Sequence, residues 1–268
     1  MPMGPAISTK SFACTIDDGL AHIVLDRAER GNPIDGEFCR EFGFCIAELS
    51  ESDDVRAVLL SARGRLFSVG GDLMSLAKQE DALPTTIKAW TAHLHPAIAR
   101  MVRMRAPVVA AVHGNVAGGS VSLMAAADVV VMAASARITA AFSKIGFSRD
   151  SGSTTTVTRR IGVARARRFF LLGETFDAQT ALSLGLVDFV VSDGAVQSEA
   201  TRIAKELAAG PTEALGAIKR LFYQTADQSL ESQLEEEAQT LAAISRTADA
   251  REGVKAFVAK RKPVFIGR

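Results

Sequence analysis

Two glycine-rich segments have the residue types and spacing to bind a developing negative charge. The first, residues 64–73, reads Gly-Arg-Leu-Phe-Ser-Val-Gly-Gly-Asp-Leu, and the second, residues 113–120, reads His-Gly-Asn-Val-Ala-Gly-Gly-Ser. Each follows an apolar, strand-like run and precedes a helix-like run. The start of a helix leaves backbone N–H groups unpaired, and glycine lets another molecule approach them. Two such starts that face each other would stabilise an oxyanion through backbone donors.

Asp150 is an acidic residue whose sequence neighbours permit more than one role. A carboxyl group buried against apolar surroundings has a raised pKa, which makes it a better proton shuttle or a desolvated nucleophile. The same residue precedes Ser151, Gly152 and Ser153 and a run of threonines, so it could equally be the N-cap of a helix. Both interpretations are open at this point.

Other catalytic motifs fit this chain less well. Residues 118–122 are similar to a nucleophile elbow, but Ser122 stands where the closing glycine is required, so the serine-hydrolase motif fails. His93 and His95 lie two residues apart on a probable helix and therefore point in different directions, which does not suit a metal pair. We expect surface or packing roles for both histidines and no metal site.

The pattern of apolar runs predicts the elements that position these residues. Asp18-Gly19 predicts a hairpin between residues 12–17 and 20–26, and Asp35 is expected to cap a helix that runs to about residue 49. Further strand-like runs, with helical patterns between them, favour a mainly parallel α/β fold. These runs are residues 57–60, 108–112, 129–132 and 186–191. We predict a core domain over residues 1–191 and a helical region over residues 192–268.

Composition is typical of a compact enzyme. With 268 residues, of which 48% are hydrophobic, the chain can bury a large core. A net charge of +1 and a pI near 7.8 give no general signal for a nucleic acid or a membrane surface as partner. The apolar runs are too short for a membrane span, and residues 1–5 show no export signal. Cys14, Cys39 and Cys45 are odd in number and predict reduced core thiols in a cytoplasmic protein.

Several segments, taken in order, resemble the crotonase (enoyl-CoA hydratase/isomerase) superfamily. They are residues 25–32, the two glycine-rich segments, residues 144–150, residues 252–257 and residues 260–265. The resemblance implies an α/β fold, the crotonase spiral of ββα units, with a C-terminal helical region that forms a homotrimer or a dimer of trimers. It implies an acyl-CoA thioester as substrate and no cofactor beyond the coenzyme A that the substrate carries.

By the same resemblance, the backbone N–H groups of Gly71 and Gly119 form an oxyanion hole for the thioester carbonyl. The hydratase branch has glutamates at the positions of Ser122 and Phe142, and neither residue can replace a carboxylate. Both Ser122 and Phe142 are candidates to line the substrate pocket. Alternatively, Ser122 is a small residue that allows helix packing, and Phe142 is an ordinary core side chain. Asp150 matches the catalytic aspartate of several family members, and residues 140–146 resemble the ring-opening isomerase of phenylacetate degradation.

For the nucleotide end of coenzyme A, the resemblance nominates the loop at residues 27–32 and the backbone from Ser68 to Leu73. Basic side chains suit phosphates, so Arg27, Arg30 and Lys260 are candidate contacts. For Lys260, a solvated C-terminal tail is the alternative. The expected function is an isomerase that moves a proton or opens a ring through Asp150. A hydratase with an atypical water-activating site and a non-catalytic CoA-thioester binder are the alternatives.

Overall fold

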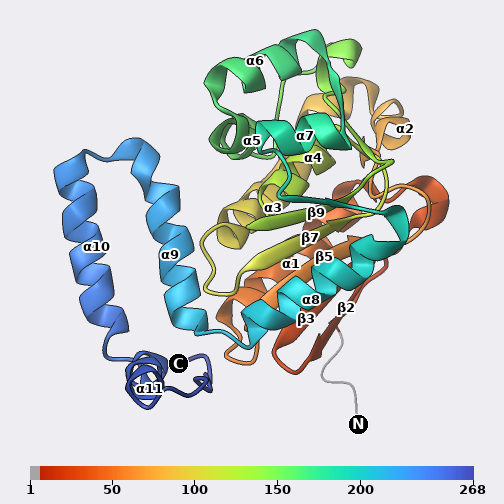
Figure 1. Cartoon of the computed structure of the whole chain (residues 1–268). Helices are drawn as coiled ribbons and strands as arrows, with labels where there is room; N and C mark the ends of the chain where they lie inside the picture. The colour runs from red at the N-terminus through yellow and green to blue at the C-terminus, as the bar shows by residue number, and fades with distance from the viewer. Residues whose placement is uncertain (1–6) are drawn as a thin grey trace.

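The computed structural model describes residues 7–268, which form one large β-sheet with helices around it (Figure 1). The strands of this sheet lie in the order β1-β2-β3-β5-β7-β9-β12. Their bounds are β1 Ile7–Ser8, β2 Phe12–Asp17, β3 Leu20–Leu25, β5 Ala57–Ala62, β7 Val108–Val112, β9 Val129–Ala133 and β12 Phe189–Val191. Two small sheets complete the fold, β4 (Pro33–Ile34) with β6 (Gly70–Gly71), and β8 (Val116–Ala117) with β10 (Arg137–Thr139) and β11 (Thr175–Asp177).

The predicted hairpin and the mainly parallel arrangement are confirmed. Asp18 and Gly19 have φ values of 45° and 78°, and they join the antiparallel strands β2 and β3. From β3 onward the pairs β3–β5, β5–β7, β7–β9 and β9–β12 are all parallel. The last strand is shorter than expected, because only residues 189–191 of the predicted run at 186–191 pair with β9.

Eleven α-helices connect and cover the strands of the described residues. They are α1 Gly36–Glu51, α2 Leu73–Leu76, α3 Leu83–Met101, α4 Gly119–Ala125, α5 Ser153–Ile161, α6 Val163–Leu172, α7 Ala178–Leu184, α8 Val196–Ala208, α9 Thr212–Gln224, α10 Leu230–Ile244 and α11 Ala248–Val258. The Asp35 side chain accepts a hydrogen bond from Phe38 N, which confirms the expected cap of α1. Phe38 and Phe42 of α1 pack edge-on against Phe12 of β2, with ring centroids 6.1 Å apart in both pairs.

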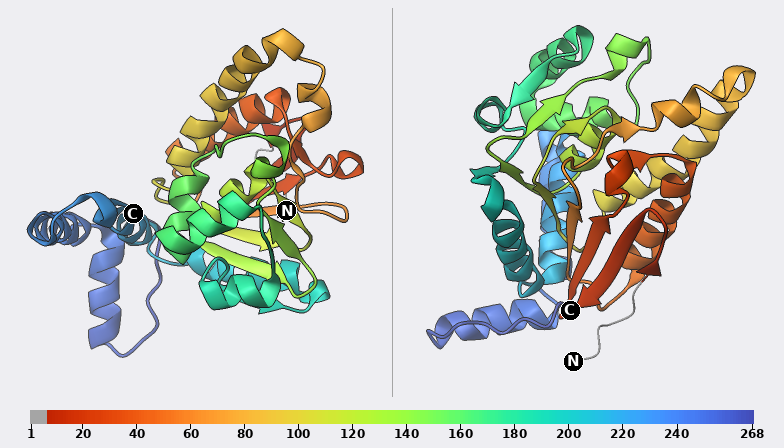
Figure 2. Two further views of the ribbon diagram at one scale, coloured as in Figure 1. Left: turned by 90° about the horizontal axis from the view of Figure 1, so that it is seen from above. Right: turned by 90° about the vertical axis from the view of Figure 1, so that its right-hand side faces the viewer.

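The large sheet separates α8 from α1 and α3, as the two turned views show (Figure 2). Cys14, Cys39 and Cys45 are buried and free, as expected of core thiols. Because α8 packs on β5, β7 and β9, the first long helix after residue 192 lies against the core. The division at residue 192 stays a prediction. None of the described helices is both long enough and apolar enough to cross a membrane.

The helices α9, α10 and α11 project from one side of the body (Figure 1). A partly buried ion pair anchors the first of them, because Lys219 Nζ lies 2.6 Å from Asp128 Oδ2 and also donates to the carbonyl oxygens of Met101 and Ala106. Burial lowers the pKa of Lys219, while the charge of Asp128 acts in the opposite direction. The projecting helices expose large apolar side chains, including Phe222 and Phe257.

Candidate active site

The fold brings the two glycine-rich segments into direct contact. Ser68 pairs with Val116 in a parallel β-bridge, and Ala117 N donates to Ser68 O. Gly70 has a φ of +83°, and a Cβ there would clash with the carbonyl oxygen of Ala117 and lie 3.0 Å from Gly119 N. Only glycine fits this crossing, because both the backbone angle and the close approach exclude a side chain.

Gly71 and Gly119 border the same cavity. A Cβ on Gly71 would have no heavy atom of the described chain within 4 Å, so this residue faces open space. Gly119 is the first residue of α4, where a backbone N–H has no acceptor within the helix. A Cβ on Gly119 would lie 3.9 Å from Asp150 Oδ1. The predicted catalytic carboxylate therefore lies beside the predicted oxyanion donor.

A cavity of about 330 Å³ opens at this point. Its size is typical of a small-molecule site. Its walls are mostly apolar and include Ile34, Leu76, Trp90 and Leu94. Five of the predicted site residues line it, namely Gly71, Leu73, Gly119, Phe142 and Asp150. A ligand here would place an apolar portion along these walls and its polar atoms at the glycine backbone and Asp150.

Asp150 does not cap the helix that follows it, so the N-cap interpretation is wrong. Helix α5 begins at Ser153, its N-cap is Gly152, and no side-chain hydrogen bond caps it. The carbonyl oxygen of Asp150 instead accepts hydrogen bonds from Ser153 N, Ser153 Oγ and Ser122 Oγ, at 3.1, 3.0 and 3.3 Å. These bonds fix the backbone of Asp150 and leave its carboxylate at the cavity.

The surroundings of Asp150 favour proton transfer. Burial raises the pKa of its carboxyl, and the nearby Ser151 hydroxyl, His95 and Arg149 oppose that change. Oδ1 is buried and has no hydrogen-bond partner among residues 7–268. Oδ1 therefore remains free to accept a bond or a proton from a ligand, and the three neighbouring groups offset only part of the rise in pKa that burial causes.

Arg149, the neighbour of Asp150, packs against aromatic rings and binds the loop. Its guanidinium lies between the rings of Phe142 and Phe170, at 4.4 and 4.2 Å from their centroids. It donates to Ser153 Oγ and to the carbonyl oxygen of Gly118. Burial lowers the pKa of Arg149 to about 10. The described residues contain no ion pair between Arg149 and Asp150, so the arginine supports the loop without neutralising the acid.

The two positions that carry glutamates in the hydratase branch have different surroundings. Phe142 lines the cavity and also stacks on Arg149. Ser122 is fully buried, and its hydroxyl contacts the Asp150 backbone and not the cavity. Neither position supplies a second carboxylate, so Asp150 is the one acid in the cavity lining of the described structure.

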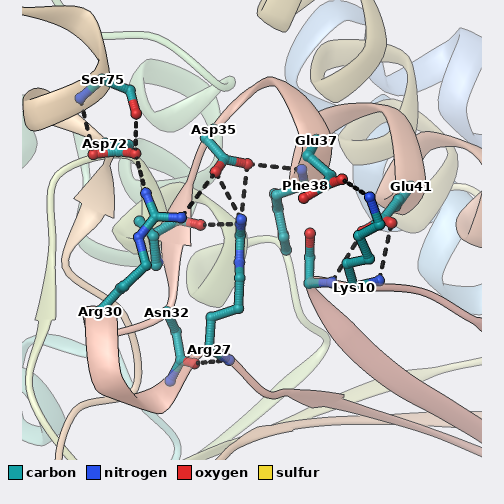
Figure 3. Close-up of polar contacts among 12 residues, drawn as sticks. Lys10, Arg27, Arg30, Asn32, Asp35, Glu37, Phe38, Glu41, Asp72 and Ser75 are labelled. Atoms are coloured by element: carbon teal, nitrogen blue, oxygen red, sulfur yellow. Dashed lines mark hydrogen bonds and ion pairs between the residues drawn. The ribbon is translucent and has the colours of Figure 1, made fainter.

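Figure 3 shows that Arg27 and Arg30 belong to a network of hydrogen bonds and ion pairs with Asp35 and Asp72. The Arg27 side chain is 9% exposed and binds Asp35 through two hydrogen bonds, at 2.7 and 3.0 Å. Arg30 is 46% exposed and bridges Asp35 and Asp72. Asp72 in turn caps α2 by accepting from Ser75 N. Both arginines thus hold the loops beside Gly71, and of the two only Arg30 exposes enough surface to meet a phosphate.

The remaining candidates lie at separate places. Ser68 is buried, and its hydroxyl donates to Asn32 O and accepts from Gly70 N, so it supports the first glycine segment. Lys260 follows α11, and α11 and α2 lie on opposite sides of the molecule (Figure 1). Within one chain, Lys260 is therefore not part of the cavity.

His95, for which the sequence predicts a surface or packing role, makes a contact at the site that the sequence did not predict. Its Nε2 accepts a hydrogen bond of 3.2 Å from Ser151 N, directly beside Asp150. The sequence shows only that His95 belongs to a helical segment, α3, and does not show that this helix lies beside Asp150. Among residues 7–268 no group of three or more His, Cys, Asp or Glu side chains could hold a metal ion.

Together, fold and site define an α/β protein with a backbone-lined anion site and one carboxylate in an apolar pocket. Comparison with known proteins identifies the family. The sequence model described as "Enoyl-CoA hydratase/isomerase" matches residues 15–268. The chain therefore belongs to the enoyl-CoA hydratase/isomerase family, and it is an acyl-CoA thioester enzyme of that family.

Individual relatives cover almost the whole chain. A 1,2-epoxyphenylacetyl-CoA isomerase of Escherichia coli is 34% identical over 254 residues, which are 94% of this chain and 97% of the relative. A probable enoyl-CoA hydratase of Rhodobacter capsulatus is 35% identical over 253 residues, covering 94% and 96%. The crystal structure of a family member from Mycobacterium abscessus superposes with a TM-score of 0.91 at 35% identity and covers 96% of this chain and 100% of its own. The expected crotonase fold is thereby confirmed.

Proposed function

We propose that this enzyme is an isomerase in which Asp150 moves a proton on an acyl-CoA thioester, or opens a ring on it, while Gly71 and Gly119 bind the thioester oxygen. Removal of a proton next to the thioester carbonyl would place negative charge on that oxygen. Two backbone N–H donors stabilise such an enolate, and the same carboxyl group returns the proton to another carbon. Atoms balance within the substrate, so product and substrate are isomers.

The observation that carries this proposal is the position of Asp150. Its carboxylate oxygen lies 3.9 Å from the Cβ position of Gly119, is buried, and is free of hydrogen bonds within the described chain. A structural carboxylate would have a partner, as Asp35 and Asp72 do. The similarity to an epoxyphenylacetyl-CoA isomerase supports an isomerase that manages with a single acid.

Product analysis in deuterated water tests the proposal. The purified protein would be incubated with 2-enoyl-, 3-enoyl-, dienoyl- and aryl-acetyl-CoA thioesters, and the products would be separated and weighed by mass spectrometry. The proposal expects an isomer of at least one substrate, with deuterium incorporated into the acyl chain where a proton moves. A gain of one water would identify the hydratase alternative. Binding without any product or exchange would identify the non-catalytic binder.

The active assembly is proposed to be a trimer or a dimer of trimers. Large apolar side chains on the projecting helices support this, with exposed fractions of 74% for Phe222, 71% for Leu241 and 85% for Phe257. Exposed apolar area of this extent is typical of a protein interface. A cytoplasmic location remains part of the proposal, and the three buried free thiols support it.

A further inference from the structure

The hydroxyl of Ser151 is a second polar group of the cavity that the proton transfer does not use. Ser151 is 1% exposed and lines the cavity next to Asp150. Its Oγ is buried and has no hydrogen-bond partner among residues 7–268. A buried hydroxyl without a partner costs free energy, because it has given up its bonds to water. Such a group is expected where a ligand supplies the missing bond.

The backbone around Ser151 is fixed independently of its side chain. Ser151 N donates to His95 Nε2, and the carbonyl oxygen of Asp150 accepts three hydrogen bonds. Ser151 also has a φ of +54°, an uncommon conformation for a residue other than glycine. The loop therefore holds Ser151 in place through main-chain contacts and leaves the hydroxyl available to the cavity.

Two polar atoms without hydrogen-bond partners among the described residues both lie near Gly119. Asp150 Oδ1 and Ser151 Oγ are each 3.9 Å from the Cβ position of Gly119. An ionised carboxylate only accepts hydrogen bonds, whereas a serine hydroxyl both donates and accepts. A hydroxyl group on the ligand matches this pair, since it can donate to Asp150 Oδ1 and accept from Ser151 Oγ. The walls around the pair are mostly apolar, so the cavity offers few other partners to such a group.

We propose that Ser151 is a specificity-determining residue and that, with Asp150, it selects acyl-CoA thioesters that carry a hydroxyl group on the acyl chain close to the thioester. The proposal rests on the proposed function, because it assumes that the thioester oxygen lies at Gly119. The position of the hydroxyl on the first carbons of the chain follows from the adjacency of Ser151 Oγ to Gly119.

Isothermal titration with matched thioesters tests this selection. Butyryl-CoA would be compared with both enantiomers of 2-hydroxybutyryl-CoA and of 3-hydroxybutyryl-CoA, and turnover would be followed in parallel. We expect at least one hydroxylated thioester to bind the wild-type protein ~10-fold or more tightly than butyryl-CoA, since an unpaired buried hydroxyl costs roughly that factor. In Ser151→Ala this advantage is expected to disappear.

Two further variants keep the test decisive. Ser151→Gly removes the hydroxyl and suits the positive φ, so it reports on selectivity even if the alanine variant folds poorly. Ser11→Ala removes another buried hydroxyl without a partner, outside the cavity lining, and is expected to retain the selectivity. Equal binding of butyryl-CoA and every hydroxylated thioester by the wild type, or an advantage that survives in both Ser151 variants, overturns the proposal. Absence of binding by all five thioesters overturns the proposed function as well.

Discussion

Replacing Asp150 with asparagine separates its proposed chemistry from any structural role. The variant keeps the shape of the side chain and removes its basicity. A positioned group that transfers a proton contributes at least ~10²-fold to the rate, equal to about 2.7 kcal/mol of transition-state stabilisation. Because Ser122 and Phe142 occupy the positions of the hydratase acids, no second carboxylate of the cavity lining can take over. We expect turnover to fall by ~10²-fold or more, with thioester binding nearly unchanged.

The pH dependence of the wild type gives a second measurement. Burial raises the pKa of Asp150, and the ionised form is the base, so turnover is expected to decline as the pH falls through that raised pKa. The residual activity of Asp150→Asn should lack this decline. Rates would be measured by following isomer formation from the thioester that the wild type converts. Wild-type turnover and wild-type deuterium exchange in the asparagine variant would refute Asp150 as the base.

As the pH rises, the stability of the wild-type protein should fall while its turnover increases. Since the folded pKa of Asp150 lies above the unfolded one, the folded protein retains a proton that the unfolded chain has lost between these two values. Wild-type stability therefore falls as the pH rises through this window. Asp150→Asn lacks the buried charge, so above the window its free energy of unfolding should exceed that of the wild type, and below it the two should converge.

A matched control is available at Asp177. This exposed aspartate caps α7 by accepting from Thr180 N, 2.8 Å away, and it does not line the cavity. Asparagine caps helices about as well as aspartate, so Asp177→Asn should leave both turnover and unfolding nearly unchanged. A loss of activity there equal to that of Asp150→Asn would show that the asparagine effect is not specific to the cavity.

Three other predictions concern the oxyanion site, the anchor of α9 and the assembly. Gly119→Pro removes the N–H donor at the first position of a helix, which accepts proline, and should cost about 2.7 to 4 kcal/mol of transition-state stabilisation. Gly119→Ala keeps the donor and should lose less. Turnover would be measured for both variants, with circular dichroism to check that they fold. Lys219→Met leaves the partly exposed Asp128 without its ion-pair partner and should lower the free energy of unfolding by roughly 1.5 to 3 kcal/mol in a urea titration, which an unchanged midpoint would contradict. The exposed Phe222 and Phe257 predict a trimer or hexamer at micromolar concentration, and light scattering that gave a monomer mass would disprove it.

Local signals in the sequence predicted the elements well. The Asp18-Gly19 turn and the Asp35 cap follow from backbone preferences of a few neighbouring residues, and the structure has both. Motif order was enough to place Gly71, Gly119 and Asp150 around one cavity. These features depend on short-range chemistry or on a resemblance that extends along the whole chain.

Contacts between distant segments could not be read from the sequence in the same way. The sequence made Arg27 a candidate to bind a phosphate, but in the structure its guanidinium forms an ion pair with Asp35, eight residues further along the chain. His95 reaches Ser151 across 56 positions, and only the packing of α3 over the cavity brings them together. A charged or polar side chain can bond to many other residue types, and the tertiary structure determines which of them lies close enough.

The charged residues near the cavity position the backbone, and this arrangement supports the proposal that a single carboxylate carries the reaction. Oxyanion donors are effective only when they are held in place before the reaction. Arg30 ties Asp35 to Asp72 on the side of Gly71, and Arg149 binds the carbonyl oxygen of Gly118 on the side of Gly119. Each arginine thus secures one half of the proposed anion site without facing Asp150 as an ion-pair partner. The acid retains its raised pKa beside a rigid set of donors, which are the conditions that a reversible proton transfer requires.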